Sequence, residues 1–431
     1  MTEPLNVVLV VLDCARAEQL SGAGYGRETT PFLDQLGREG VRFTSMIATA
    51  PWALPAHASL FTGLYPVTHG ATDERRALSA RHATLPQYFK TAGYRTAAFC
   101  TNPWVSPETG FGRGFDAFYT QRYHNRLAAR AVLYGRRASD RLLRRKDAGA
   151  RRTNQALRRW IASGTQPFFA FVHYHELHLS ITPPSPYDRM FASSPSTDAA
   201  TRRIARYDGA LRYVDARVRE IADFLQARGE WERTAFIVTG SHGVDLGEPA
   251  TAARRLSLSD AWLRVPLIVR CPSQVPQGFS VDDIAQTTDV LPTILRLAGI
   301  AVDGSRVQGR ALFDAGRATP GPAFAVAERF RPNLAALRTR FPDADTRAFD
   351  VRRKAIRSRR EKFVWHSDEA NEFYDLIADP GESDNRIERD VGRADRLRRQ
   401  LFDWLATVEQ AETVEAMPEL DEQVQGAGDS D

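Results

Sequence analysis

Polar residues that could bind a metal ion or take part in ester hydrolysis occur at three places along the chain. Asp13 directly follows an apolar run, three histidines and a glutamate lie within 173–178, and Ser241 and His242 follow another apolar run. Carboxylates and imidazoles bind divalent cations, so residues that are distant along the chain could together form a metal site.

The elements that must position these residues are short apolar strands that alternate with helices. Strands are expected at 7–12, 96–99, 168–173, 235–239 and 267–270, and helices at 31–40, 85–92, 208–228 and 289–299. This alternation is typical of an α/β fold with a mostly parallel central sheet flanked by helices on both faces. Because catalytic groups in such folds lie at the carboxyl ends of strands, we expect Asp13, the histidines and Ser241 to meet at one edge.

A smaller C-terminal region begins near Ala323, where the pattern changes to two strands, a turn and a helix. The strands are expected at 362–366 and 372–376, and the helix at 394–409. We therefore predict a main α/β domain over 1–322 and a small α+β subdomain over 323–410. Residues 411–431 are acidic and are expected to form a disordered tail.

Composition is that of a globular protein. The chain has 431 residues, of which 43% are hydrophobic and 26% charged, which excludes a disordered or fibrous protein. The apolar run 7–12 is too short to cross a bilayer and no basic leader precedes it, so we expect a cytoplasmic protein without a transmembrane segment. Cys14, Cys100 and Cys271 are too few and too dispersed for a disulfide framework or a CxxC zinc site.

Positive charge is concentrated in one segment, although the formal net charge is only +5. Twelve arginines lie between Gln121 and Trp160. We interpret 121–160 as an Arg-rich helical insertion that could contact an acidic partner, such as nucleic acid, an anionic membrane surface or an acidic polymer. The alternative is a solvated pair of amphipathic helices.

Two short segments, together with Asp13, resemble active-site motifs of the sulfatase family within the alkaline phosphatase superfamily. The segments are 51–63, Pro-Trp-Ala-Leu-Pro-Ala-His-Ala-Ser-Leu-Phe-Thr-Gly, and 238–243, Val-Thr-Gly-Ser-His-Gly. The resemblance extends from about Asn6 to about Arg386. It implies a sulfatase-like fold and, as the expected activity, hydrolysis of sulfuric or phosphoric esters.

The resemblance places the family's nucleophile at a residue that cannot attack. When the end of the first segment is aligned with the family signature, the nucleophilic Cys or Ser falls at Ala53, and the following arginine falls at His57. Sulfatases oxidise that Cys or Ser to formylglycine, and related phosphatases use an unmodified Thr or Ser. Alanine has no oxygen or sulfur to donate, so no formylglycine and no covalent intermediate are expected here. His57 could be catalytic or structural, and the segment could also be a plain connection with Pro55 at a turn.

The metal ligands of the family are also incomplete. The resemblance implies that Asp13 is a ligand, although an aspartate at a strand end can also cap a helix. A second Asp often follows in the family, where this chain has Cys14, and Ser-Asp-His-Gly is replaced by a sequence in which Ser241 stands for the Asp and His242 is kept. Serine is a weak neutral ligand, so Ca²⁺ or Mg²⁺ is expected to bind weakly or not at all.

Two further positions follow from the resemblance. His178 matches a histidine near the leaving group, and Arg254 or Arg255 falls near an active-site lysine. The histidines of 173–178 could instead bind zinc, but they lack helical HExxH spacing, which argues against that reading.

Three functions remain open. The first is a sulfatase-like ester hydrolase that is catalytically impaired. The second is a non-catalytic anion-binding or regulatory protein that holds a sulfate or phosphate ester. The third is an active hydrolase that uses metal-bound water, with Asp245 or Glu248 as extra ligands. The pocket of the second reading would be lined by His57, His178, His242 and Arg254 or Arg255.

Overall fold

A computed structural model of the chain describes residues 4–120, 147–178, 182–192, 198–247, 257–272, 274–331, 334 and 350–416. Within these ranges, no helix has the length and apolar character needed to cross a membrane. The helices are α1 (Pro31–Arg38), α2 (Ala53–Thr62), α3 (Pro66–His69), α4 (Leu85–Thr91), α6 (Ala150–Ala162), α7 (Ala199–Ala227), α8 (Asp260–Leu263), α9 (Val290–Leu297) and α11 (Val391–Ala416).

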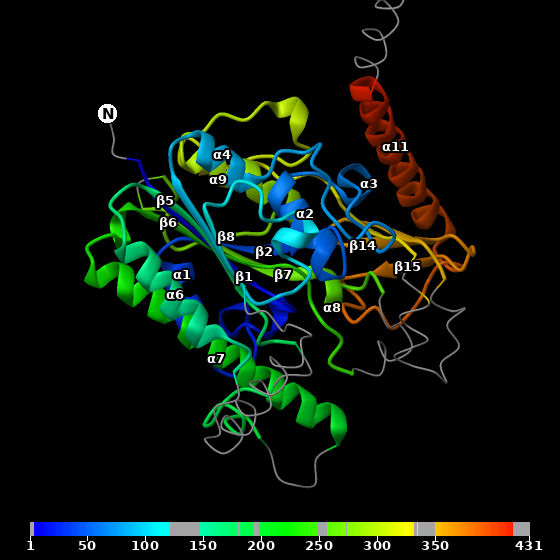
Figure 1. Cartoon of the computed structure of the whole chain (residues 1–431). Coiled ribbons are helices and arrows are strands. Elements are labelled where there is room, and N and C mark those ends of the chain that lie inside the picture. Colours follow the sequence, from blue (N-terminus) through cyan, green and yellow to red (C-terminus); the bar gives the residue numbers. More distant parts are fainter. Residues whose placement is uncertain are drawn as a thin grey trace, which may run out of the picture.

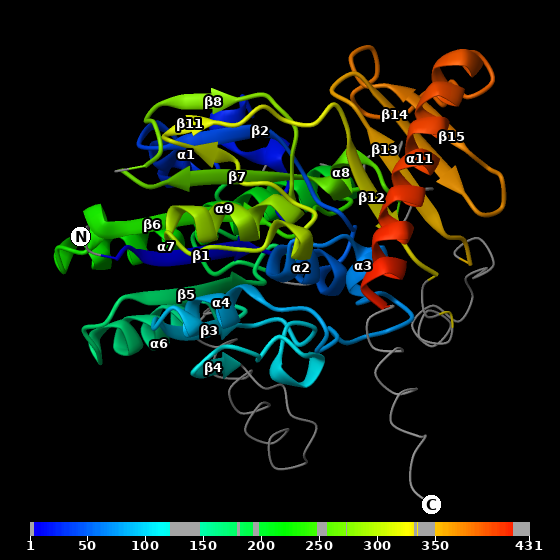
Figure 2. The same ribbon diagram turned by 90° about the horizontal axis from the view of Figure 1, so that it is seen from above.

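The main domain is built on a mixed, mostly parallel sheet in the order β4-β3-β5-β1-β6-β7-β2-β8 (Figure 2). Strand β9 also pairs with β2. Its strands are β1 (Asn6–Leu12), β2 (Val41–Ile47), β3 (Arg95–Cys100), β4 (Ala117–Thr120), β5 (Phe168–Tyr174), β6 (Thr234–Gly240), β7 (Arg264–Arg270), β8 (Phe279–Val281) and β9 (Ala285–Gln286). Among these described strands, β7 alone runs antiparallel to its neighbours. The predicted α/β fold is therefore confirmed.

Helices cover both faces of the sheet, which explains why every residue of the central strand β1 is buried (Figure 1). Val7, Leu9 and Val11 pack with residues of α2, α4 and α9. Val8 and Val10 pack with α1, α6 and α7 on the opposite face. Side chains of a strand alternate between its two faces, so a strand buried on both sides reads as a continuous apolar run.

Several elements differ from the sequence prediction. The helix expected at 208–228 begins at Ala199, because the carboxylate of Asp198 accepts hydrogen bonds from the N–H groups of Ala200 and Thr201 at 2.8 and 3.0 Å. Strand β2 was not predicted, since its polar residues interrupt the apolar pattern. Residues 150–160 belong to α6, whose buried side chains pack in the core on one face of the sheet. This part of the expected insertion is therefore one of the helices that cover the sheet. Residues 121–146 lie outside the described ranges.

The C-terminal region forms a four-stranded antiparallel sheet in place of the two strands expected. Its strands are β12 (Ala325–Arg329), β13 (Arg353–Arg357), β14 (Glu361–His366) and β15 (Glu372–Asp375), and a separate hairpin consists of β10 (Phe313–Asp314) and β11 (Arg317–Ala318). Helix α11 packs on this sheet through Leu397 and Leu401 (Figure 2). The helix continues to Ala416, so the first residues of the expected tail are helical. Residues 417–431 lie outside the described ranges.

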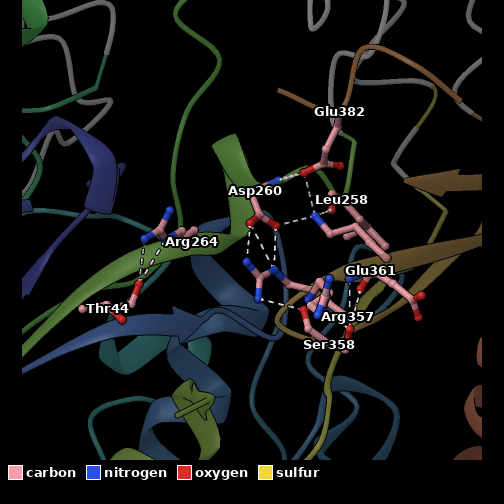
Figure 3. Close-up of polar contacts among 10 residues, drawn as sticks. Thr44, Leu258, Asp260, Arg264, Arg357, Ser358, Glu361 and Glu382 are labelled. Atoms are coloured by element: carbon pink, nitrogen blue, oxygen red, sulfur yellow. Dashed lines mark hydrogen bonds and ion pairs between the residues drawn. The ribbon is translucent and has the colours of Figure 1, made fainter. Parts of the chain in front are cut away.

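A buried ion cluster joins the C-terminal sheet to the main domain (Figure 3). Asp260, the first residue of α8, accepts hydrogen bonds from Arg357 and from Lys362, whose side chain is fully buried. Lys362 Nζ also lies 2.8 Å from Glu382 Oε1, and Glu382 accepts a hydrogen bond from the backbone N–H of Asp260. The turn at 379–382 therefore supplies a counter-ion to a buried lysine.

Candidate active site

The carboxyl ends of β1, β3, β5 and β6 meet at one edge of the sheet, and polar residues follow each of them. The parallel register continues beyond the strands: the N–H of Asp13 donates to Tyr174 O at 2.9 Å, and the N–H of Ser241 donates to Leu12 O at 3.3 Å. Residues that are 228 positions apart in sequence thereby become neighbours. The structure brings Asp13, Ser241 and His242 together, as the strand-end pattern indicates.

Asp13 is the centre of the site and is 1% exposed. Its Oδ1 accepts a hydrogen bond from Ser241 Oγ at 2.7 Å, and its Oδ2 accepts from Asn102 Nδ2 and His175 Nδ1, both at 2.8 Å. Burial by itself raises the pKa of Asp13, but the hydrogen bond from His175 and the charge of that imidazole hold the pKa well below its ordinary value. Asp13 is therefore an ionised acceptor.

His175, one residue beyond β5, reaches this edge as expected for the histidines of 173–178, whereas the sequence analysis did not name Asn102. Asn102 lies two residues beyond β3, so the same strand-end position that identified Asp13 could have found it. Burial alone would lower the pKa of His175, but its hydrogen bond to Asp13 raises it. Both residues orient the carboxylate of Asp13.

Cys14 brings its sulfur into the site. Its Sγ lies 3.6 Å from His242 Nε2. Asp13, Cys14 and His242 each offer a ligand atom within 4.8 Å of the others, and within the described ranges they are the only group of this kind. Burial, then the charge of Asp13, raises the pKa of Cys14 well above its ordinary value.

Ser241 and His242 are held by α8 as well as by β6. Ser241 Oγ lies 2.9 Å from His242 Nδ1, which is itself 3.3 Å from Asp13 Oδ1. Burial lowers the pKa of His242 to about 4 against the opposing effect of Asp13, so the imidazole is neutral at pH 7. The next residue, Gly243, donates its N–H to Trp262 O at 2.7 Å.

Gly243 has no room for a side chain, since an added Cβ would lie 2.0 Å from the carbonyl oxygen of Ala261. We expect Gly243→Ala to lower the free energy of unfolding by about 1–3 kcal/mol, because the backbone that carries His242 must shift. Urea unfolding measures this. Gly304→Ala is the matched control, because a Cβ there meets no atom within 4 Å. Equal stability of the two variants would contradict the prediction.

Ala53 and His57 lie in the first turns of α2. Ala53 is the first residue of that helix and presents a methyl group that is 7% exposed. Pro55 lies in the same first turn of α2, where a proline is tolerated because the backbone N–H groups there have no partner within the helix. Pro55 is therefore not at a turn between two elements, as the alternative interpretation expected. His57 Nδ1 lies 2.7 Å from Ala53 O and donates to it.

His57 and His173 are fully buried neighbours, with ring centroids 5.0 Å apart. Burial lowers the pKa of both, so both are neutral at pH 7. His57 Nε2 and both ring nitrogens of His173 have no hydrogen-bond partner within the described part of the chain. The contact between His173 Nε2 and Asp13 Oδ2 is long, at 3.8 Å.

His178 lies beside the site, with its ring centroid 4.9 Å from that of His175. It lines a narrow recess of about 10 Å³ together with Arg203 and Arg206 of α7. Glu176 does not join the cluster, because its carboxylate accepts the N–H of Ala150 at 2.7 Å. Asp245 accepts from the N–H of Gly247 at 2.6 Å. Arg254, Arg255 and Glu248 lie outside the described residues.

The donor set does not suit Ca²⁺ or Mg²⁺, which take six or more oxygen ligands. Within the described ranges, Asp13 supplies the only carboxylate of the three-residue group. Asn102 Oδ1 accepts the N–H of Trp104 at 2.8 Å, so the amide turns its nitrogen, not its oxygen, toward Asp13. The other two donors are a sulfur and an imidazole.

Known proteins share both the sequence pattern and the fold. The profile described as Sulfatase matches residues 5–300, and the profile described as N-sulphoglucosamine sulphohydrolase, C-terminal, matches residues 253–411. An ulvan-active sulfatase of Formosa agariphila is 26% identical and covers 90% of this chain and 77% of its own. A multifunctional alkaline phosphatase superfamily protein of Trinickia caryophylli is 24% identical over 68% and 74% of the two chains.

Solved structures agree at the level of fold. The phosphonate monoester hydrolase of Agrobacterium radiobacter has a TM-score of 0.75 at 21% identity, over 94% of this chain and 95% of its own. A protein solved with its substrate D-glucosamine-2-N,6-O-disulfate has a TM-score of 0.71 at 16% identity, over 95% and 98%. Because the Sulfatase profile matches well over half of the chain, the chain belongs to the sulfatase family.

Proposed function

We propose that this protein binds a sulfate or phosphate ester, or its anionic product, and does not hydrolyse it through a covalent intermediate. The observation that carries the proposal is Ala53. It is the first residue of α2, one helical turn before His57, at the position aligned with the family's nucleophile. A methyl group has no lone pair with which to attack sulfur or phosphorus.

Within the described ranges, the neighbouring hydroxyl and thiol groups of Ser59, Ser241 and Cys14 do not replace the missing nucleophile, because each is otherwise engaged. Ser59 Oγ hydrogen-bonds Thr49 and His69, on a later turn of α2. Ser241 Oγ donates to Asp13. The Cys14 thiol is kept protonated by burial and by the charge of Asp13, and a protonated thiol is a poor nucleophile.

Groups that could hold an anion are retained. His57 packs against His173, whose Nε2 is 3.8 Å from Asp13 Oδ2, and His178, Arg203 and Arg206 line a narrow recess. A site that keeps such groups without the nucleophile could bind an anion but could not stabilise the transition state selectively.

Hydrolysis without a side-chain nucleophile is the second candidate function. The observation that favours it is the approach of Asp13, Cys14 and His242 to within 4.8 Å of one another, because three protein ligands and one open position are typical of catalytic metal sites. The two candidates differ in whether any ester is turned over.

Turnover distinguishes these candidates. We expect the purified protein to release phenol from aryl sulfates and aryl phosphates no faster than its His242→Ala variant, since the covalent route lacks its nucleophile. The measurement is continuous absorbance with both proteins assayed in the same metal-supplemented buffer. Calorimetric titration with sulfate and phosphate should show binding to the wild-type protein. Hydrolysis well above the His242→Ala rate would reject the non-catalytic proposal and favour the second candidate.

A further inference from the structure

We propose that Asp13, Cys14 and His242 form a site for a thiophilic divalent cation, foremost Zn²⁺, and that Cys14 is the residue that turns cation preference away from Ca²⁺ and Mg²⁺. This inference concerns cation identity and is independent of whether any ester is hydrolysed.

The spacing of the donor atoms fits zinc. With Zn–S near 2.3 Å and Zn–N near 2.0–2.1 Å, a tetrahedral angle places a bound sulfur and nitrogen about 3.6 Å apart. Cys14 Sγ and His242 Nε2 are 3.6 Å apart. A ligand atom of Asp13 lies within 4.8 Å of both residues' donors, so a small inward movement completes a three-ligand group. Binding replaces the thiol proton by the cation, and that proton leaves to solvent.

The backbone directs the sulfur into the site. Cys14 has φ 63°, a left-handed conformation that a residue with a Cβ adopts at a cost of roughly 1–2 kcal/mol. The turn is held by Tyr207 of α7, whose hydroxyl donates to Cys14 O at 2.8 Å and accepts the N–H of Arg16 at 2.9 Å. Strain that is held in place by its surroundings often marks a functional position.

Unpartnered buried nitrogens beside the group give a second, independent indication of a bound species. His57 and His173 are fully buried, and His57 Nε2 and both nitrogens of His173 have no hydrogen-bond partner within the described part of the chain. Because Nδ1 of His57 donates to Ala53 O, its Nε2 carries a lone pair. Leaving such a group unsatisfied costs about 1–3 kcal/mol, and a bound hydrogen-bond donor beside it would satisfy it.

The chemistry of the donors selects the cation. Sulfur and imidazole bind zinc and other late transition metals, whereas Ca²⁺ and Mg²⁺ require oxygen. A carboxylate and a thiolate together neutralise a divalent charge in a site that is almost closed to solvent, since Asp13, Cys14 and His242 are 1%, 4% and 6% exposed. The carboxylate is also held in position for a cation, because His175 and Asn102 both donate to Asp13.

The test is cation binding by the full-length protein. Protein stripped with a chelator and dialysed is titrated with Zn²⁺ in the presence of excess Ca²⁺ and Mg²⁺, and bound metal is counted by mass spectrometry. We expect one equivalent of Zn²⁺ that Ca²⁺ and Mg²⁺ do not displace. Co²⁺ in the same site should show a thiolate-to-cobalt charge-transfer band in the near ultraviolet, which reports the sulfur ligand directly.

Variants separate this site from adventitious binding. Cys14→Ser should abolish the cobalt band and weaken Zn²⁺ binding by at least about 100-fold. Mutating a residue that only hydrogen-bonds to a metal ligand lowers metal affinity by up to about 100-fold, and loss of a ligand itself should cost no less. Cys271→Ser removes another buried cysteine and should retain both signals. Cys14→Asp should shift preference toward Ca²⁺ and Mg²⁺. Circular dichroism and thermal melting verify that each variant is folded.

Three outcomes would overturn the proposal: no Zn²⁺ equivalent bound, equal Zn²⁺ affinity in the wild-type and Cys14→Ser proteins, or Ca²⁺ displacing Zn²⁺ from the wild-type protein. None of these outcomes depends on turnover, so the zinc site can be disproved while the non-catalytic function stands. Likewise, the non-catalytic function can be disproved by ester hydrolysis while the zinc site stands.

Discussion

Asp260→Ala is expected to lower the free energy of unfolding by about 3–5 kcal/mol, because removing one partner of a buried ion cluster leaves the other charges without compensation. Lys362 is fully buried and, among the described residues, would keep Glu382 alone as a counter-ion. Arg357 would lose the carboxylate that it contacts through Nε and Nη2 at 3.0 and 2.8 Å. The measurement is urea or thermal unfolding of the full chain at pH 7. Figure 3 shows Asp260 between Arg357 and Glu382.

The pH dependence gives a second readout of the same variant. Burial raises the pKa of Asp260, but Lys362 and Arg357 outweigh it, and the pKa is lowered. A lowered carboxyl pKa contributes stability that is present above the unfolded pKa, near 3.9, and is lost as the pH falls through the folded value. The stability difference between wild-type and Asp260→Ala proteins should therefore be full at pH 7 and should narrow below about pH 4.

Asp223→Ala is the matched control for the ion cluster. Asp223 pairs with Arg219 at 3.7 Å on α7, and both side chains are more than half exposed. An exposed pair is worth about 0.2–1 kcal/mol, so this variant should stay close to the wild type. If Asp260→Ala lost no more stability than Asp223→Ala, the buried cluster would not hold the C-terminal sheet to the main domain.

The double variant Ala53→Thr with Ser241→Asp is expected to gain phosphoesterase activity that neither single variant has. The introduced threonine would supply a hydroxyl at the start of α2, and the new carboxylate would stand beside Asp13 and His242, where Ser241 Oγ now lies 2.7 Å from Asp13 Oδ1. Loss of a nucleophile costs about 10⁶ in rate in a well-studied hydrolase, so even partial recovery should exceed the wild-type rate by roughly 1,000-fold. The assay is aryl phosphate hydrolysis with Mg²⁺, Ca²⁺ or Zn²⁺ supplied.

Isosteric variants show which atoms matter. Ala53→Val with Ser241→Asp matches the shape of the threonine variant but has no hydroxyl, and Ala53→Thr with Ser241→Asn has no added charge. Both controls should stay at the wild-type rate. A folded double variant that binds a cation yet shows no hydrolysis would mean that more than these two positions separates the site from an active esterase.

The sequence by itself determined the fold class and the reason for expecting little turnover. A continuous apolar run of strand length indicates a strand that is buried on both faces of a sheet. Because this pattern is local in the sequence, β1, β3, β5, β6 and β7 could all be predicted. The positions of Asp13, Ser241 and His242 after strands, and the methyl group of Ala53 in the aligned motif, could likewise be read along the chain.

Only the tertiary structure decided which groups touch. From the sequence alone, Cys14 was interpreted as the replacement of a metal-ligand aspartate. In the structure, its left-handed backbone conformation brings its sulfur next to His242, which is 228 residues away in the sequence. Asn102 and His175 became partners of Asp13, and Glu382 became the counter-ion of Lys362. The physical reason is that such contacts depend on the order of strands in the sheet, with β1 between β5 and β6, and no local periodicity encodes that order.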